Sequence, residues 1–119
     1  MNLVFVFLAL QVAEAPPAPD LVAAEDYARC IGLTAVTGSA RIPSIDEAVR
    51  RAFEQCAPKR ATALALLTDA FRTGGLSDAE ASETAAGLLR DNDEIMSNKL
   101  KSHIASYRAT GQVPDNASD

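Results

Sequence analysis

Start and stop signals divide this chain of 119 residues into four helical stretches, and they constrain its fold more than any other feature. The segments Ser44 to Glu47 and Ser77 to Glu80 have the form of capping boxes, in which serine and glutamate side chains satisfy backbone donors of a first helical turn. Gly74-Gly75 ends the intervening helix, because glycine adopts the left-handed cap conformation without steric cost. Alanine, the best helix former, is abundant throughout, and no run resembles a strand. The sequence therefore predicts an all-α fold, a small bundle of about four helices.

The helix boundaries follow from these signals together with proline. The first helix is expected over about residues 20 to 36, capped by Asp20 and ended at Gly38. The second follows Ser44, and the third covers Lys59 to Thr73, with Pro58 in its first turn forming a tight corner with the second. Spacings of three and four residues predict buried stripes on the first helix (Leu21, Ala24, Tyr27, Ala28, Ile31, Ala35), the second (Ala48, Val49, Ala52, Phe53, Cys56) and the third (Ala61, Leu64, Ala65, Leu67, Thr68, Phe71).

The last stretch contains no glycine-proline break before Gly111 and Pro114. One helix of about 33 residues would be about 50 Å long, which is far longer than its neighbours. Its apolar stripe is interrupted by the polar segment Arg90 to Glu94. Either the helix kinks near Asp91 to Asp93, or its far half projects beyond the bundle and packs on a partner. The candidate partner surface consists of Leu88, Met96, Leu100, Ile104 and Tyr107.

The N-terminus has the pattern of an export signal. An apolar run from Leu3 to Leu10 ends at Ala13-Glu14-Ala15, which supplies small residues at a cleavage site. The run is shorter than the roughly 20 residues of a membrane span. No Lys or Arg precedes the run, and Pro16 follows the best cleavage site, so the sequence does not decide whether the signal is cleaved. One alternative to a cleaved signal is a retained N-terminal anchor, which would be the only expected contact with a membrane. The other is an apolar N-terminal element of a cytosolic domain.

A cleaved signal at residues 1–15 predicts a periplasmic or secreted protein. The remainder is 119 minus 15, or 104 residues, a length at which one domain is the norm. We expect a proline-rich leader at residues 16–19, a helical domain at 20–110 and a flexible tail at 111–119.

Cys30 and Cys56 are the only cysteines, and in an exported chain such a pair predicts a disulfide. With the first helix ending near residue 36, a strictly antiparallel pairing would leave the two cysteines about 9 Å apart along the axis. The helices must therefore cross, or the first helix must end near Leu33. A catalytic or redox cysteine is the alternative, but there is no Cys-x-x-Cys motif, and the one histidine, His103, is distant in sequence.

The other groups of polar and charged residues predict no catalytic reaction, no metal site and no cofactor site. The chain has 16 acidic and 11 basic residues and a net charge of -5, without the basic stripe that nucleic-acid binding requires. Asp91 to Glu94 lacks the spacing and glycine of a calcium loop. His103 is expected to be a satisfied or partly exposed residue of the apolar stripe. On the second helix, Asp46–Arg50, Glu47–Arg51 and Arg50–Glu54 are expected to form solvated ion pairs.

The segments Tyr27 to Cys30, Ala52 to Cys56 and Ala57 to Arg60, followed by an alanine-leucine helix, resemble small exported bacterial helical proteins with two cysteines and no assigned activity. The likeness covers about residues 25 to 72. It implies a periplasmic helical fold and assigns no catalytic residue.

These observations favour a non-enzymatic protein that acts through protein or envelope contacts, including a homodimer, formed by its last helix. A small-molecule carrier with a pocket between helices is the alternative. An enzyme of unknown class is the third hypothesis, for which no reacting pair is visible.

Overall fold

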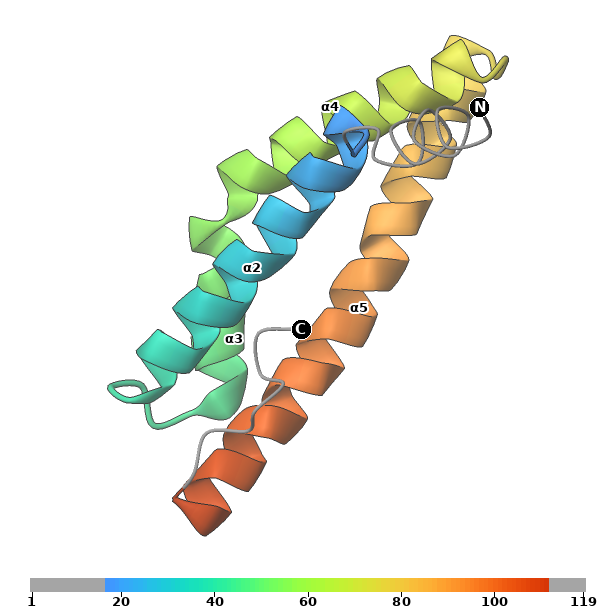
Figure 1. The fold of residues 1–119 in the computed structure, drawn as a ribbon. Coiled ribbons are helices and arrows are strands. Elements are labelled where there is room, and N and C mark those ends of the chain that lie inside the picture. The colour runs from blue at the N-terminus through green and yellow to red at the C-terminus, as the bar shows by residue number, and fades with distance from the viewer. Residues whose placement is uncertain (1–16, 112–119) are drawn as a thin grey trace, which may run out of the picture.

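The computed structural model describes residues 17–111, which form four α-helices and no strand (Figure 1). The helices are α2 (Pro19–Ser39), α3 (Ile45–Gln55), α4 (Ala57–Thr73) and α5 (Asp78–Thr110). The predicted all-α fold with four helices, one disulfide and a long C-terminal helix is confirmed. The predicted signal peptide, Pro16 and all of the predicted tail after Gly111 lie outside the described residues.

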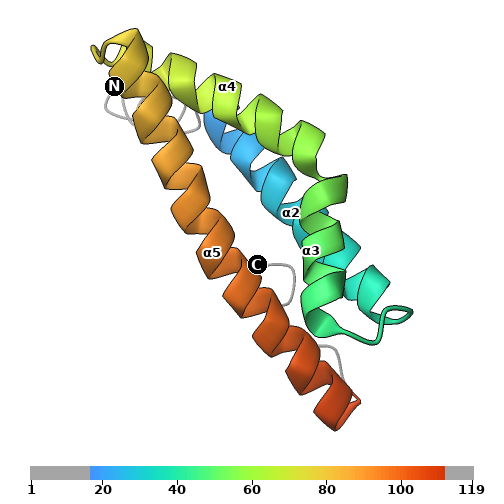
Figure 2. The same ribbon diagram turned by 180° about the vertical axis from the view of Figure 1, so that it is seen from behind.

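The four helices form three long segments, which we call legs: α2, then α3 together with α4, then α5. α2 runs down the molecule, α3 and α4 return as one leg bent at Cys56, and α5 runs back along its full length (Figures 1 and 2). α2 packs on both halves of the bent leg, and α5 packs on α4 near its start and on α3 near its end. The corner occurs where Cys56 ends α3 and precedes α4, with Pro58 in the first turn of α4 as expected.

The serine half of each predicted capping box forms, whereas the glutamate half does not. Ser44 accepts a hydrogen bond from the backbone N–H of Glu47, and Ser77 accepts one from that of Glu80, each at 3.2 Å. The carboxylate of Glu47 binds Arg50 and Arg51, and that of Glu80 accepts from the Ser77 hydroxyl and not from a backbone N–H.

The start of the first helix also differs from the prediction. α2 begins at Pro19, one residue before the predicted Asp20, and Asp20 makes no cap. The fixed φ of proline and its missing donor suit the first helical position, so Pro19 belongs to the helix and not to the leader.

The C-terminal boundary of α2 was predicted too early. The helix continues through Gly38 to Ser39, because a single glycine lowers helix stability by only about 1 kcal/mol and does not end a helix by itself. α4, in contrast, ends at Thr73 as predicted, where Gly75 takes a φ of 108°.

The extra turn of α2 explains how the disulfide forms. Cys30 and Cys56 are bonded, with their Cα atoms 6.0 Å apart. Cys30 precedes the end of α2 by nine residues (39 minus 30), and Cys56 follows the start of α3 by eleven (56 minus 45). An offset of two residues is only about 3 Å, so near-antiparallel helices satisfy the bond. The predicted alternative, an end near Leu33, is wrong, since α2 is longer than expected.

The core lies where the three legs meet. Its largest fully buried side chains are those of Tyr27, Ile31, Leu89, Val49 and Cys56. Four residues of the predicted stripes are exposed instead, because each stripe is narrower than the set of three- and four-residue steps: Leu21, Ala28, Ala61 and Ala65.

α5 is one helix that passes through Asp91 to Asp93 without interruption, so the predicted kink is absent (Figure 2). Its far half packs on the chain itself, since Leu100 and Ile104 are 4% and 2% exposed. Near the end, the Arg108 guanidinium donates hydrogen bonds of 2.5 to 2.7 Å to the carbonyl oxygens of Ser39, Ile42 and Pro43. The last turn of α5 therefore fixes the loop between α2 and α3.

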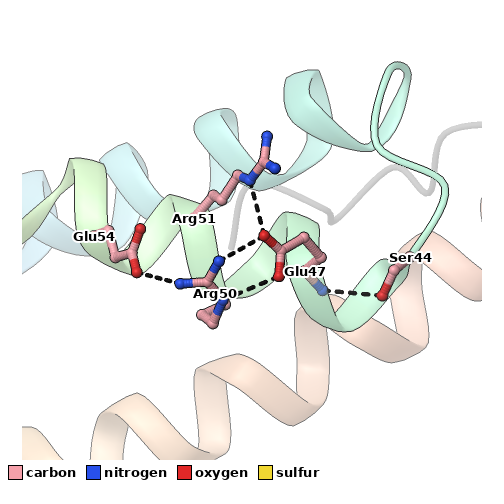
Figure 3. A network of polar contacts seen from close by, with 5 residues as sticks. All are labelled: Ser44, Glu47, Arg50, Arg51 and Glu54. Carbon is pink, nitrogen blue, oxygen red and sulfur yellow. Dashed lines mark hydrogen bonds and ion pairs between the residues drawn. The ribbon is translucent and has the colours of Figure 1, made fainter.

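The exposed side of α3 carries a network of charged side chains (Figure 3). Glu47 accepts hydrogen bonds from Arg50 and Arg51, and Arg50 also pairs with Glu54. These bonds, that of Arg50 first, lower the pKa of the Glu47 carboxyl to about 2. The predicted Asp46–Arg50 pair does not form, because Asp46 pairs with Lys101 of α5 at 3.4 Å. Exposed pairs of this kind contribute little to stability, so the network belongs to the solvated surface.

Candidate functional site

A polar cluster joins three helices, α2, α4 and α5. The Tyr27 hydroxyl of α2 donates a hydrogen bond of 2.6 Å to one carboxylate oxygen of Asp93 in α5. The Arg60 Nε of α4 donates one of 2.8 Å to the other oxygen. Asp93 lies in the polar segment that interrupts the predicted apolar stripe, and its two partners explain why a carboxylate is accommodated there.

The cluster is electrostatically satisfied. Burial raises the pKa of Tyr27 above its usual value of 10.0, and the hydrogen bond to Asp93 raises it further. The same carboxylate raises the pKa of Arg60. Tyr27 is therefore held as a neutral donor and Arg60 as a cation. Because every member has a partner, the cluster positions α5 against α2 and α4 and offers no free group for chemistry.

An apolar groove of about 240 Å³ lies beside this cluster, between α2 and α5. It is lined by Ala24, Tyr27, Ala28, Leu89, Asn92, Ile95, Met96 and Lys99. Large apolar side chains remain in water at its edges: Ile95 is 66% exposed, and Leu88 is 45% exposed. Leu21, 56% exposed, precedes Ala24 by one turn on the same side of α2. Exposed apolar side chains therefore lie close to this groove: Ile95 is in its lining, and Leu88 and Leu21 are each one helical turn from a lining residue.

Ile95 is also the centre of a continuous exposed face of α5. Residues three, four and seven positions before and after it share one side of a helix. All of them are exposed: Leu88, Asp91, Asn92, Asn98, Lys99 and Ser102. We call these six residues and Ile95 the α5 face. It spans 15 residues, from Leu88 to Ser102, and is about 21 Å long at 1.5 Å per residue.

The predicted partner surface on α5 is only partly available. Leu88 is exposed, and Met96 and Tyr107 are half-buried. Leu100 and Ile104 belong to the core of the chain itself, since they contact the other helices and not solvent. The available surface is therefore rotated about the helix axis from the predicted stripe, and Ile95, which the sequence analysis did not include, takes the central position.

A second, larger groove of about 610 Å³ lies between α2 and α3. Its base contains small residues such as Gly38, Ala48 and Ala52, and two guanidinium groups, Arg41 and Arg51, line its sides. Thr34, Thr37 and Gln55 add hydroxyl and amide groups. Arg108 holds the loop that carries Arg41 and Ile42, so this end of the groove is fixed by α5.

His103 is partly exposed, which agrees with the expectation of a satisfied or partly exposed residue. Its Nδ1 is enclosed without a hydrogen-bond partner among the described residues. No group of three or more His, Cys, Asp or Glu residues within residues 17–111 is arranged to hold a metal ion. None of the four helices combines the length and the apolar character needed to cross a membrane, over the part of the chain that is described.

Comparison with known proteins gives no relative: no family model, curated protein or solved structure matches this chain. The two grooves, the α5 face and the disulfide are the features of this chain that bear on its function.

Proposed function

We propose that this protein is a non-enzymatic interaction module whose docking surface is the α5 face together with the apolar groove beside it. The observation that carries this proposal is the exposure of Ile95 at the centre of a face that is exposed over its whole length. Burying such a side chain completely contributes about 1.5 to 3 kcal/mol. Ile95, Leu88 and Leu21 are 66%, 45% and 56% exposed, so covering each of them contributes roughly half of that amount to association.

The packing of α5 on the other helices does not depend on these exposed apolar residues. Leu89, Leu100 and Ile104 already hold α5 to the other helices, and Asp93 fixes its position. The inner side of α5 thus serves stability and leaves the outer face free for a partner. An exposed apolar centre surrounded by polar residues is the usual arrangement of an interaction site.

Photocrosslinking tests this proposal. A benzophenone amino acid replaces Ile95 in the full chain, expressed in the organism that makes the protein. A matched chain carries it at Ala105, which is exposed on α5 but lies outside the α5 face. We expect a discrete adduct from position 95 and none from position 105. No adduct at position 95, or equal adducts at both positions, would refute the proposal.

We also propose that the protein works outside the cytosol, in the periplasm or after secretion. The Cys30–Cys56 disulfide supports this, because such bonds persist in oxidising compartments, and the apolar leader at residues 1–15 supplies a route of export. Alkylation of the protein as it is made in its own cells provides the test. We expect both thiols to resist alkylation until a reductant is added, and free thiols on a cytosolic full-length chain would contradict export.

The groove between α2 and α3 favours a second function, that of a carrier for a small organic anion. Its volume falls in the range of about 300 to 1,000 Å³ that is usual for ligand sites. Arg41, which makes no ion pair among the described residues, would bind a carboxylate beside Arg51, whose Nε is held by Glu47. The small side chains at the base leave room for an apolar portion.

Native mass spectrometry distinguishes this function from the first. The full chain, purified without denaturation, would retain an adduct that Arg41→Gln loses. Arg29→Gln, which removes an exposed arginine of α2 away from the groove, should retain it. A wild-type spectrum without any adduct, or the same adduct in all three chains, would exclude the carrier function.

A further inference from the structure

We infer that the partner of the α5 face is a second copy of this chain, packed antiparallel about a twofold axis at Ile95. This inference rests on the proposed function, since it names the occupant of the same surface. The structure supports it by the distribution of charge along α5, by the positions that a twofold axis would bring together, and by which charges already have partners.

The charges of α5 change sign at Ile95. All six carboxylates of the helix precede this residue, and three of its four basic residues follow it. A parallel copy would place acidic half against acidic half. An antiparallel copy places the acidic half of each helix against the basic half of the other, and it also opposes the two helix dipoles.

A twofold axis at Ile95 pairs positions that are equally distant from it. Asp91 and Lys99 are each four residues from Ile95, so the carboxylate of one copy faces the ammonium group of the other, twice per dimer. Asn92 and Asn98, each three residues away, pair in the same way and can exchange amide hydrogen bonds. The two Ile95 side chains meet on the axis. Such a surface is complementary to itself, as a twofold interface requires.

The charges that would pair across the axis have no ion-pair partner among the residues that the structure describes. Asp93 is held by Arg60, and Lys101 by Asp46. Asp91 and Lys99, in contrast, make no ion pair within residues 17–111, and both are exposed. Near the axis, the charged residues of the α5 face are therefore free for a second copy.

Sedimentation velocity of the full chain at several concentrations and low salt tests the inference by charge reversal. The wild type should form dimers, and more weakly at high salt. Asp91→Lys alone and Lys99→Asp alone each place like charges across the axis and should raise the dimer dissociation constant at least about tenfold.

The decisive sample is a mixture of the two single variants. One chain then presents two lysines and the other two aspartates, so a heterodimer has both pairs restored, and we expect association to return to within about threefold of the wild type. Glu25→Lys in α2 and Lys59→Asp in α4 make the same charge changes at exposed positions outside α5 and should dimerise like the wild type.

Each result decides the matter. Monomeric wild type at every concentration, dimers that persist in both single variants, or a mixture that stays monomeric would overturn the inference. The crosslinked adduct at position 95 separates this failure from that of the proposed function. An adduct with the mass of two chains supports the dimer, whereas one of any other mass keeps the interaction surface and removes the second copy as its occupant.

Discussion

Asp93 shows how a single side chain resolves the most ambiguous part of this sequence. It lies 66 residues from Tyr27 and 33 from Arg60, so no local pattern could assign its partners. The polar interruption of the apolar stripe was visible, but it was interpreted as a kink or a projecting end. It is a half-buried contact between helices instead, because a carboxylate between a hydroxyl and a guanidinium can remain at a helix interface.

Replacing Asp93 by alanine should destabilise the protein. The change leaves the Tyr27 hydroxyl and the Arg60 guanidinium without their acceptor in a place only partly open to water. We expect a loss of about 2 kcal/mol in the free energy of unfolding, which is reduced by partial solvation of the arginine. Urea denaturation measures it. Glu94→Ala, an exposed neighbour, should stay within about 0.5 kcal/mol of the wild type, and an equal loss in both would contradict the role of Asp93.

Tyr27 also makes the stability depend on alkaline pH. Its pKa is raised in the folded protein, so the unfolded chain loses this proton first as the pH rises through 10. The contribution of the raised pKa is fully present below pH 10 and is lost progressively above it. Wild type should therefore lose stability more steeply above pH 10 than Tyr27→Phe, as followed by denaturation at fixed pH values. Parallel curves would show that the hydroxyl is not buried as described.

Among the contacts between helices, the disulfide is expected to make the largest single contribution to the free energy of unfolding. It joins α2 and α3 across a sequence separation of 26 residues, and loop closure of that size stabilises a protein by about 3.5 kcal/mol in the chain-entropy model. The doubly substituted chain Cys30→Ala, Cys56→Ala should lose an amount of this order, seen as a lower denaturation midpoint. A reductant should lower the midpoint of the wild type and leave that of the double variant unchanged. If it changed neither, the bond would not be contributing.

Helix ends were predictable where a single residue determines the backbone and less so where the tertiary fold decides. The serine caps at Ser44 and Ser77 and the glycine stop at Gly74 depend on bonds within one turn, and the structure confirms them. The end of α2 depends on Arg108, which donates to the carbonyl of Ser39 from 69 residues away. A local signal such as Gly38 could not predict a boundary held by another helix.

The whole molecule divides the work of α5 between its two sides. Leu89, Leu100 and Ile104 close the core, while Ile95 and its exposed neighbours face outward along the same helix. Helix periodicity predicted that α5 would be long and that it would carry an interaction surface. It assigned Leu100 and Ile104, which are buried, to that surface, because an apolar stripe alone does not reveal which side the other helices cover.

The function was less accessible to sequence analysis than the fold. Caps, glycines and alanine content act locally and therefore specify four helices. The α5 face and both grooves arise from the packing of helices that are distant in sequence, so their positions emerge only when the legs are assembled. The apolar pattern of α5 did not single out Ile95, because this residue lies off the buried stripe and directly after the polar segment Arg90 to Glu94.

The most direct test of this account is the molar mass of the full chain carrying Ile95→Glu, measured by light scattering at a concentration where the wild type is dimeric. The account predicts the mass of one chain and a melting temperature equal to that of the dissociated wild type, because Ile95 serves the interface and not the core. A dimeric mass for the variant would contradict it. So would a melting temperature well below that of dissociated wild type, since Ile95 would then be part of the fold.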